Sequence, residues 1–95
     1  DKAVLGLSNE QKEKLLFIRK ETKESLKKLK LLIDELETEV IDAMMDREAP
    51  STVESQVYEI AKLKAEATKI HLKCISNTTA VLSDEQLEFL LPFWD

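Results

Sequence analysis

Apolar residues recur along residues 9–49 at three- and four-residue steps, and polar residues fill the positions between them. This spacing places the apolar residues on one face of an amphipathic helix. No glycine or proline interrupts the stretch. The pattern therefore predicts one helix over residues 9–48, which would be about 60 Å long at ~1.5 Å per residue. The apolar positions, called the first stripe below, are Leu15, Ile18, Thr22, Leu26, Leu29, Ile33, Leu36, Val40 and Met44.

A second stripe follows Pro50 and predicts a helix over residues 53–80. Its positions alternate three- and four-residue steps, as in a coiled-coil seam. Ser51 is the predicted N-cap of this helix, with Glu54 as its partner in a capping box. The short turn at 49–52 makes the two helices antiparallel neighbours, which predicts a long helical hairpin. The second stripe is Ile60, Leu63, Ala67, Ile70, Cys74, Asn77 and Val81.

The phrase Leu-Ser-x-Glu-Gln occurs twice, at residues 7–11 and again at 82–86. Each copy predicts a helix start in which a serine hydroxyl and a glutamine side chain cap backbone N–H groups reciprocally. The second copy would begin a short C-terminal helix over 84–91. Local physics explains each helix start separately, but not why the two are so alike. The residues of the two motifs are Leu7, Ser8 and Gln11, and Leu82, Ser83 and Gln86.

Composition supports an all-α fold in a single domain, residues 1–95. The chain has one glycine and two prolines, and 35% of its residues are charged, which is typical of long solvated helices. A few long helices in so short a chain enclose little interior, so we expect a second copy to complete the burial. The net charge of −5 argues against nucleic acid as a partner. We expect no membrane span, because no apolar run approaches ~20 residues, and the chain shows no signal peptide.

Charge is segregated along the first predicted helix. Residues 12–30 carry eight Lys or Arg against three Asp or Glu, a net charge of +5. Residues 31–48 carry one Arg against seven acids, a net charge of −6. A solvated helix face with ordinary i,i+4 pairs is one interpretation. The other is an antiparallel homodimer whose two-fold axis lies near residues 30–31, so that the basic half of one copy meets the acidic half of the other.

Taken together, "LSNEQ", "LSDEQ" and the run "EIAKLKAEA" at 59–67 resemble the Spy/CpxP-like periplasmic proteins, which carry two LTxxQ motifs. Serine replaces threonine in both copies, which keeps the capping hydroxyl. The resemblance covers essentially the whole chain. It implies a bacterial, periplasmic protein that forms curved, antiparallel homodimers of hooked helical hairpins. It also implies that the two motifs lie near each other in the folded hairpin.

The resemblance implies three kinds of activity. One branch of the family consists of ATP-independent chaperones for unfolded proteins, and another attenuates envelope-stress sensor kinases. The third binds metals and includes the nickel/cobalt sensor CnrX and zinc-associated proteins. The preferred hypothesis is a stress-response protein that binds unfolded clients or a sensor-kinase partner through basic and apolar residues. The candidate client or partner residues are Lys12, Lys20, Lys23, Lys27, Lys28 and Lys30, with Phe89, Phe93 and Trp94 in the apolar C-terminal segment. The other interpretation of this segment is that it docks against the open end of the hairpin, as apolar residues usually become buried.

His71 and Cys74 carry the alternative hypothesis, a heavy-metal sensor or resistance protein. They lie three residues apart on one predicted helix, and imidazole with thiolate suits zinc, nickel or copper. Two ligands make half of a tetrahedral site, which a nearby two-fold axis would complete. Cys74 also fits the apolar stripe as a small hydrophobic residue. Relative to the CnrX pattern, Cys74 stands in place of a histidine, Thr78 of a methionine and Arg19 of a glutamate, so that sensor's site is not reproduced.

Catalysis has no support in the sequence. There is no glycine-rich phosphate loop, and no serine or cysteine has a persuasive base and orienting partner. We therefore expect no enzyme. A structural coiled-coil dimer without a ligand is the third hypothesis.

Overall fold

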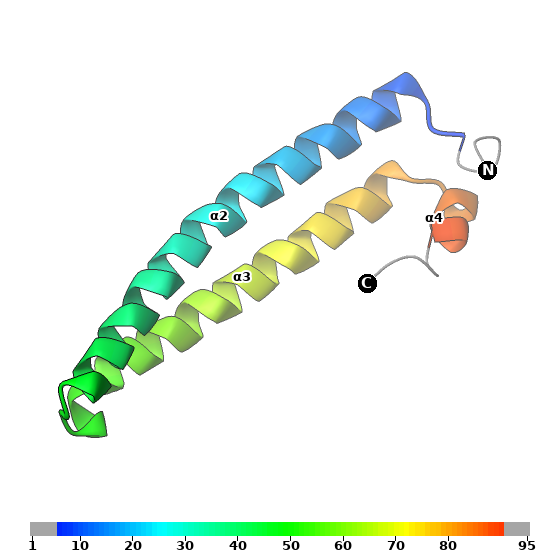
Figure 1. The fold of residues 1–95 in the computed structure, drawn as a ribbon. Coiled ribbons are helices and arrows are strands. Elements are labelled where there is room, and N and C mark those ends of the chain that lie inside the picture. The colour runs from blue at the N-terminus through cyan, green and yellow to red at the C-terminus, as the bar shows by residue number, and fades with distance from the viewer. Residues whose placement is uncertain (1–5, 91–95) are drawn as a thin grey trace.

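The structure, a computed structural model, describes residues 6–90, with side chains through Glu88. Every regular element in this range is helical, which confirms the all-α prediction. The elements are α2 (Asn9–Met45), the 3-10 helix η1 (Pro50–Val53), α3 (Glu54–Val81) and α4 (Asp84–Leu90). α2 and α3 lie side by side and run in opposite directions, and α4 turns away at the end opposite η1 (Figure 1). The molecule is extended, measuring 60 × 22 × 19 Å. The end that carries α4 is called the open end below.

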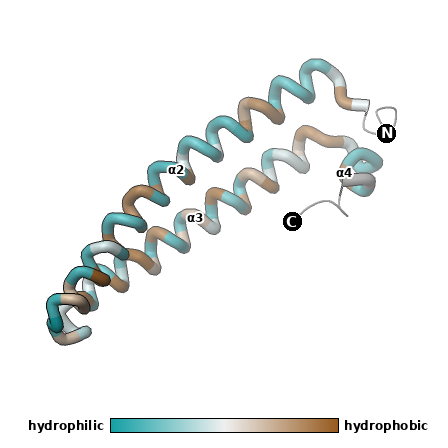
Figure 2. The backbone as a smooth tube through the Cα atoms, in the orientation of Figure 1, coloured by the Kyte–Doolittle hydropathy of each residue, from teal (hydrophilic) through white to brown (hydrophobic). Residues whose placement is uncertain are grey.

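The helix pair buries side chains near its two ends but is only partly covered between them. In residues 6–88, the buried apolar side chains are Ala43 and Val53 near the turn and Leu82 beside α4. Both predicted stripes are half-buried along their length, except that Met44 and Asn77 are exposed. Hydrophobic and hydrophilic segments alternate along both long helices, as Figure 2 shows. So little burial in a chain of this size leaves the folded state with a small hydrophobic driving force of its own.

The C-terminal end of α2 differs from the prediction, because the helix ends at Met45 and not at residue 48. Arg47 adopts a left-handed conformation with φ of 64°. Its N–H donates to the carbonyl of Met44, and the N–H of Glu48 donates to the carbonyl of Ala43, both at 3.0 Å. This pair of bonds is a Schellman motif, which satisfies the last carbonyls of the helix. The helix therefore ends several residues before Pro50, and the proline does not terminate it.

We expect Arg47→Gly to stabilise the protein. A left-handed residue with a Cβ costs ~1 kcal/mol or more, whereas glycine has no Cβ to clash. The flexibility of glycine in the unfolded chain offsets part of this gain, which leaves about 0.5–1 kcal/mol of added stability. Thermal unfolding followed by circular dichroism measures it as a rise of a few degrees in Tm. Arg47→Ala keeps the Cβ and is the control. An equal rise in that variant would show that the arginine side chain, and not the backbone, is the source of the effect.

The predicted cap of the second helix is wrong. Ser51 does not cap α3, because Pro50 begins the 3-10 helix η1 and places Ser51 inside it. Proline suits this first position, since its fixed φ is helical and its missing N–H would be unpaired there anyway. α3 then begins at Glu54 after Val53, with no side-chain cap, so Glu54 is not the partner of a capping box either. The backbone continues directly from η1 into α3, so η1 stands where the sequence predicted a side-chain cap.

Candidate functional site

Both copies of the repeated motif form the predicted capping boxes. The N–H of Gln11 donates to the Ser8 hydroxyl at 3.0 Å, and the N–H of Ser8 donates to the side-chain oxygen of Gln11 at 2.9 Å. Ser83 and Gln86 repeat this arrangement at 3.1 and 2.9 Å. Each box satisfies two N–H groups that a helix start leaves without intrahelical partners.

The two glutamines also bond to each other across the open end. Gln11 Nε2 donates to Gln86 Oε1 at 2.9 Å, and Gln86 Nε2 donates to Gln11 Oε1 at 3.4 Å. We call this reciprocal pair the amide lock. It joins positions 75 residues apart and confirms that the two motifs lie near each other. Because the pair is partly buried, each bond stabilises the fold by about 0.5–1.5 kcal/mol.

Two backbone carbonyls extend the amide lock into the chain on either side. Gln11 Nε2 donates to the carbonyl of Val81 at 3.0 Å, at the last residue of α3. Gln86 Nε2 donates to the carbonyl of Gly6 at 3.3 Å. Gly6 has φ of 43°, a conformation that glycine adopts without a steric cost. The single glycine of the chain is therefore placed where its backbone meets the lock.

One side of the helix pair, called the groove flank, carries a groove of about 260 Å³ between α2 and α3. Thr22, Ser25, Cys74 and Asn77 line it, and the side chains of Thr22, Ser25 and Cys74 are too small to fill the space as leucines would. Toward the open end the groove meets a second hollow, with which it shares Ile18 and Asn77. The charged residues of the groove are Glu21, Glu24, Lys28 and Lys73.

The other side, called the cationic flank, is identified by an ion pair. Lys64 of α3 bonds Glu37 of α2 at 3.5 Å, so these two side chains lie on one side of the pair. Residues that successive steps of seven or eleven positions separate from Glu37 or Lys64 lie on the same face of the same helix. Glu37 is half-buried, and the other residues of this side are exposed. The cationic flank consists of Lys12, Arg19, Lys30 and Glu37 on α2, and of Val57, Lys64, His71 and Ile75 on α3.

The face of α2 that points away from α3 carries a further heptad-spaced row, which we call the outer seam. Its apolar members are Leu16, Leu31, Ile41 and Met45, which are 58–78% exposed. The basic half borders a hollow of about 540 Å³ lined by Lys20, Lys23, Lys27 and Lys30 with Glu24 and Leu26. The acidic half borders a hollow of about 500 Å³ lined by Leu31, Asp34, Glu35, Thr38 and Glu39. In order, the outer seam is Leu16, Lys20, Lys23, Lys27, Leu31, Asp34, Thr38, Ile41 and Met45.

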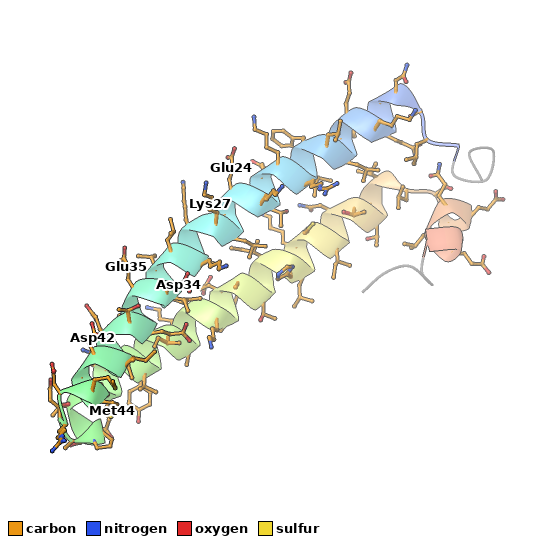
Figure 3. All side chains as sticks on the ribbon, in the orientation of Figure 1. Glu24, Lys27, Asp34, Glu35, Asp42 and Met44 are labelled. Carbon is orange, nitrogen blue, oxygen red and sulfur yellow. The ribbon has the colours of Figure 1, made fainter. Side chains whose placement is uncertain are left out.

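The basic and acidic halves follow each other along α2. In Figure 3, Glu24 and Lys27 of the basic half lie farther from the turn, and Asp34, Glu35 and Asp42 of the acidic half lie nearer to it. The six candidate lysines are all exposed, but they do not share one surface. Lys20, Lys23 and Lys27 belong to the outer seam, Lys12 to the cationic flank and Lys28 to the groove flank. Lys30 belongs to the cationic flank and also lines the hollow that borders the basic half of the outer seam.

The candidate metal ligands are on different surfaces of α3. Cys74 is half-buried and lines the groove, whereas His71 is exposed on the cationic flank. Within residues 6–90, no third His, Cys, Asp or Glu joins them to form a cluster. His71 and Cys74 would fill at most two positions of a zinc, nickel or copper site, so the metal hypothesis needs further ligands from outside residues 6–90.

The aromatic candidates near the C-terminus fall outside what the structure describes. The side chain of Phe89 is not described, and Phe93 and Trp94 lie beyond residue 90. Their proposed contact with a client or partner therefore remains a prediction.

Sequence reasoning missed the amide lock, although it contained a signal. A capping box uses only the side-chain oxygen at its third position, which glutamate supplies equally well. Glutamine at both copies leaves two NH2 groups without an assigned acceptor, and these groups make the lock. The groove was missed too. Its signal was the run of short or polar side chains at stripe positions, namely Thr22, Cys74 and Asn77.

The arrangement offers surfaces for binding and a lock that fixes the open end. Within the described part of the chain, neither long helix contains a stretch apolar enough to cross a membrane. Comparison of the sequence and structure with known protein families, curated proteins and solved structures found no match.

Proposed function

We propose that this chain is a non-enzymatic periplasmic protein that holds unfolded clients, or a sensor-kinase partner, without ATP, as its resemblance to Spy/CpxP-like proteins implies. The observation that supports it best is apolar surface exposed beside cations. Eleven large apolar side chains in the described residues are exposed, whereas three apolar residues are buried. Of these, Val57 and Ile75 lie on the cationic flank, and apolar side chains left exposed by a folded chain can mark a surface that binds other proteins.

The binding surface proposed for clients is the cationic flank. Lys12, Arg19 and Lys30 supply positive charge along α2, and Val57 and Ile75 supply apolar area on α3, at 49% and 37% exposure. Charge attraction acts over a distance of ~10 Å in 0.1 M salt, and apolar contact acts only on touching. Clients would therefore be captured first by the cations and then held by the apolar side chains. Lys28, on the groove flank, would add a cation near the middle of α2.

We further propose that the helix pair is a hooked hairpin that dimerises along the outer seam. A two-fold axis between residues 30 and 31 pairs positions whose numbers add up to 61. This register sets Lys27 against Asp34 and Lys20 against Ile41, and it sets Leu16 against Met45 at the ends. Charge complementarity of +5 against −6 favours the antiparallel register. Lys20, Lys23 and Lys27 then contact the second copy and not a client.

An aggregation-suppression assay tests the client proposal. The full chain is added to a denatured model protein as it refolds, and light scattering is recorded. We expect suppression without nucleotide, and we expect it to weaken as added salt shortens the Debye length toward ~3 Å at 1 M. Lys12→Gln with Arg19→Gln should weaken suppression at least twofold at low salt. The matched control, Lys62→Gln with Lys69→Gln on α3, removes the same charge outside the cationic flank.

Two results would count against this function. Equal loss in the two double variants would show that net charge, and not the cationic flank, governs the effect. No suppression at any ratio of protein to client would leave a sensor partner or a purely structural role as the remaining explanation.

A further inference from the structure

The open end of the helix pair carries a shallow apolar hollow of about 360 Å³ on the groove flank. Phe17 and Ile18 of α2 line it together with Ala80 and Val81 of α3. Phe17 is 61% exposed, so the described residues leave most of its side chain uncovered. Covering a phenylalanine and its apolar surroundings would stabilise the protein, because burial of aromatic side chains is strongly favourable.

The chain supplies a matching segment directly after α4. Residues 91–95 read "LPFWD" and contain Phe93 and Trp94. Pro92 restricts its own φ and biases the residue before it toward extended geometry, which suits a strap lying across a surface. Two aromatic rings left in water would keep a large apolar area exposed.

The chain is long enough for this segment to reach the hollow. Val81 is both part of the hollow and the last residue of α3, only three positions before α4 begins at Asp84. α4 has seven residues, so it is about 10 Å long. Gln86 of α4 bonds Gln11, which in turn bonds the carbonyl of Val81, so the first turn of α4 lies beside the hollow. Leu90 follows Gln86 by four residues, about 6 Å of helix. Five extended residues span up to about 17 Å. The segment is therefore long enough to return from the end of α4 to the hollow.

We propose that residues 91–95 dock onto the open-end hollow of their own chain, with Phe93 and Trp94 covering Phe17, Ile18, Ala80 and Val81. The docked segment acts as a strap over the apolar part of the groove flank. The docking proposal is independent of the client proposal, because docking is measured with no client present.

Trp94 is the single tryptophan of the chain and reports docking directly. In the full chain we expect its fluorescence maximum to be blue-shifted and its quenching by acrylamide to be weak. Phe17→Asp should move the maximum to the value of a solvent-exposed indole and raise the quenching constant several-fold. Leu72→Asp is the matched control, because Leu72 is 60% exposed on α3 but does not line the hollow. Circular dichroism should show unchanged helix content in both variants.

Three results would overturn the proposal. A solvent-exposed maximum in the unaltered protein would show that the strap is not docked. A blue-shifted maximum that Phe17→Asp leaves unchanged would show that Trp94 is buried at another place. A blue shift that disappears on dilution would show that the segment docks onto a second copy and not onto its own chain.

Discussion

Lys27→Glu is expected to dissociate a dimer of this chain, and adding Asp34→Lys to the same chain is expected to restore it. In the proposed register these two positions face each other across the two-fold axis, so symmetry makes the pair twice. Each exposed pair contributes about 0.2–1 kcal/mol, and reversal replaces attraction with repulsion of similar size. The two pairs together change the free energy of association by about 2 kcal/mol, which is roughly 30-fold in Kd. Sedimentation equilibrium at low salt measures it.

The charge swap is diagnostic because it separates the effect of a direct contact between positions 27 and 34 from the effect of net charge. The double variant has the net charge of the unaltered chain, and its recovery depends only on the two positions being opposite each other. Lys62→Glu on α3 is the control for a single reversal, because Lys62 lies outside the outer seam. If the unaltered protein is monomeric at high concentration, or if the swap fails to restore association, the outer seam is not a dimer interface.

Helical periodicity predicted most of the fold, because it depends only on local steps along the chain. The two stripes and their antiparallel arrangement follow from three- and four-residue spacing and a short connection. The motif caps also followed, since Ser8 and Ser83 each stand before a helix with a glutamine three positions later. Ser51 has the same pattern with Glu54, yet Pro50 before it begins a helical turn one residue earlier. A neighbouring residue can therefore overrule a capping pattern.

Features that depend on how the two helices meet were not predictable in the same way. The left-handed Arg47 has no marker, because glycine is the usual residue at that position. The groove forms where short stripe side chains from both helices coincide, which requires the register between the helices. The outer seam and the cationic flank also required that register, which the Lys64–Glu37 pair supplies. The charge halves were visible in the sequence, but the faces that carry them were not.

Replacing both Gln11 and Gln86 with glutamate is expected to release the open end while leaving both caps in place. Glutamate keeps the oxygen that accepts from Ser8 or Ser83, so each capping box survives. The substitutions remove the NH2 donors to Val81, to Gly6 and between the two side chains. Losing these partly buried bonds costs about 0.5–1.5 kcal/mol each, and the two carboxylates would also repel at close range. We expect a total destabilisation of about 3 kcal/mol or more, measured by urea unfolding.

Hydrogen exchange and pH distinguish loss of the amide lock from general damage. Faster exchange should be confined to α4 and the first turn of α2, because the turn end keeps Ala43 and Val53 buried. Below the ordinary glutamate pKa of about 4.3, the introduced carboxyl groups are protonated and can donate again. The deficit relative to the unaltered chain should therefore shrink as pH falls through that range and be largest at neutral pH. Gln56→Glu introduces the same group near the start of α3 and should show neither effect. Equal stability of the double variant at neutral pH would mean that packing of Leu82, and not the amide lock, fixes the open end.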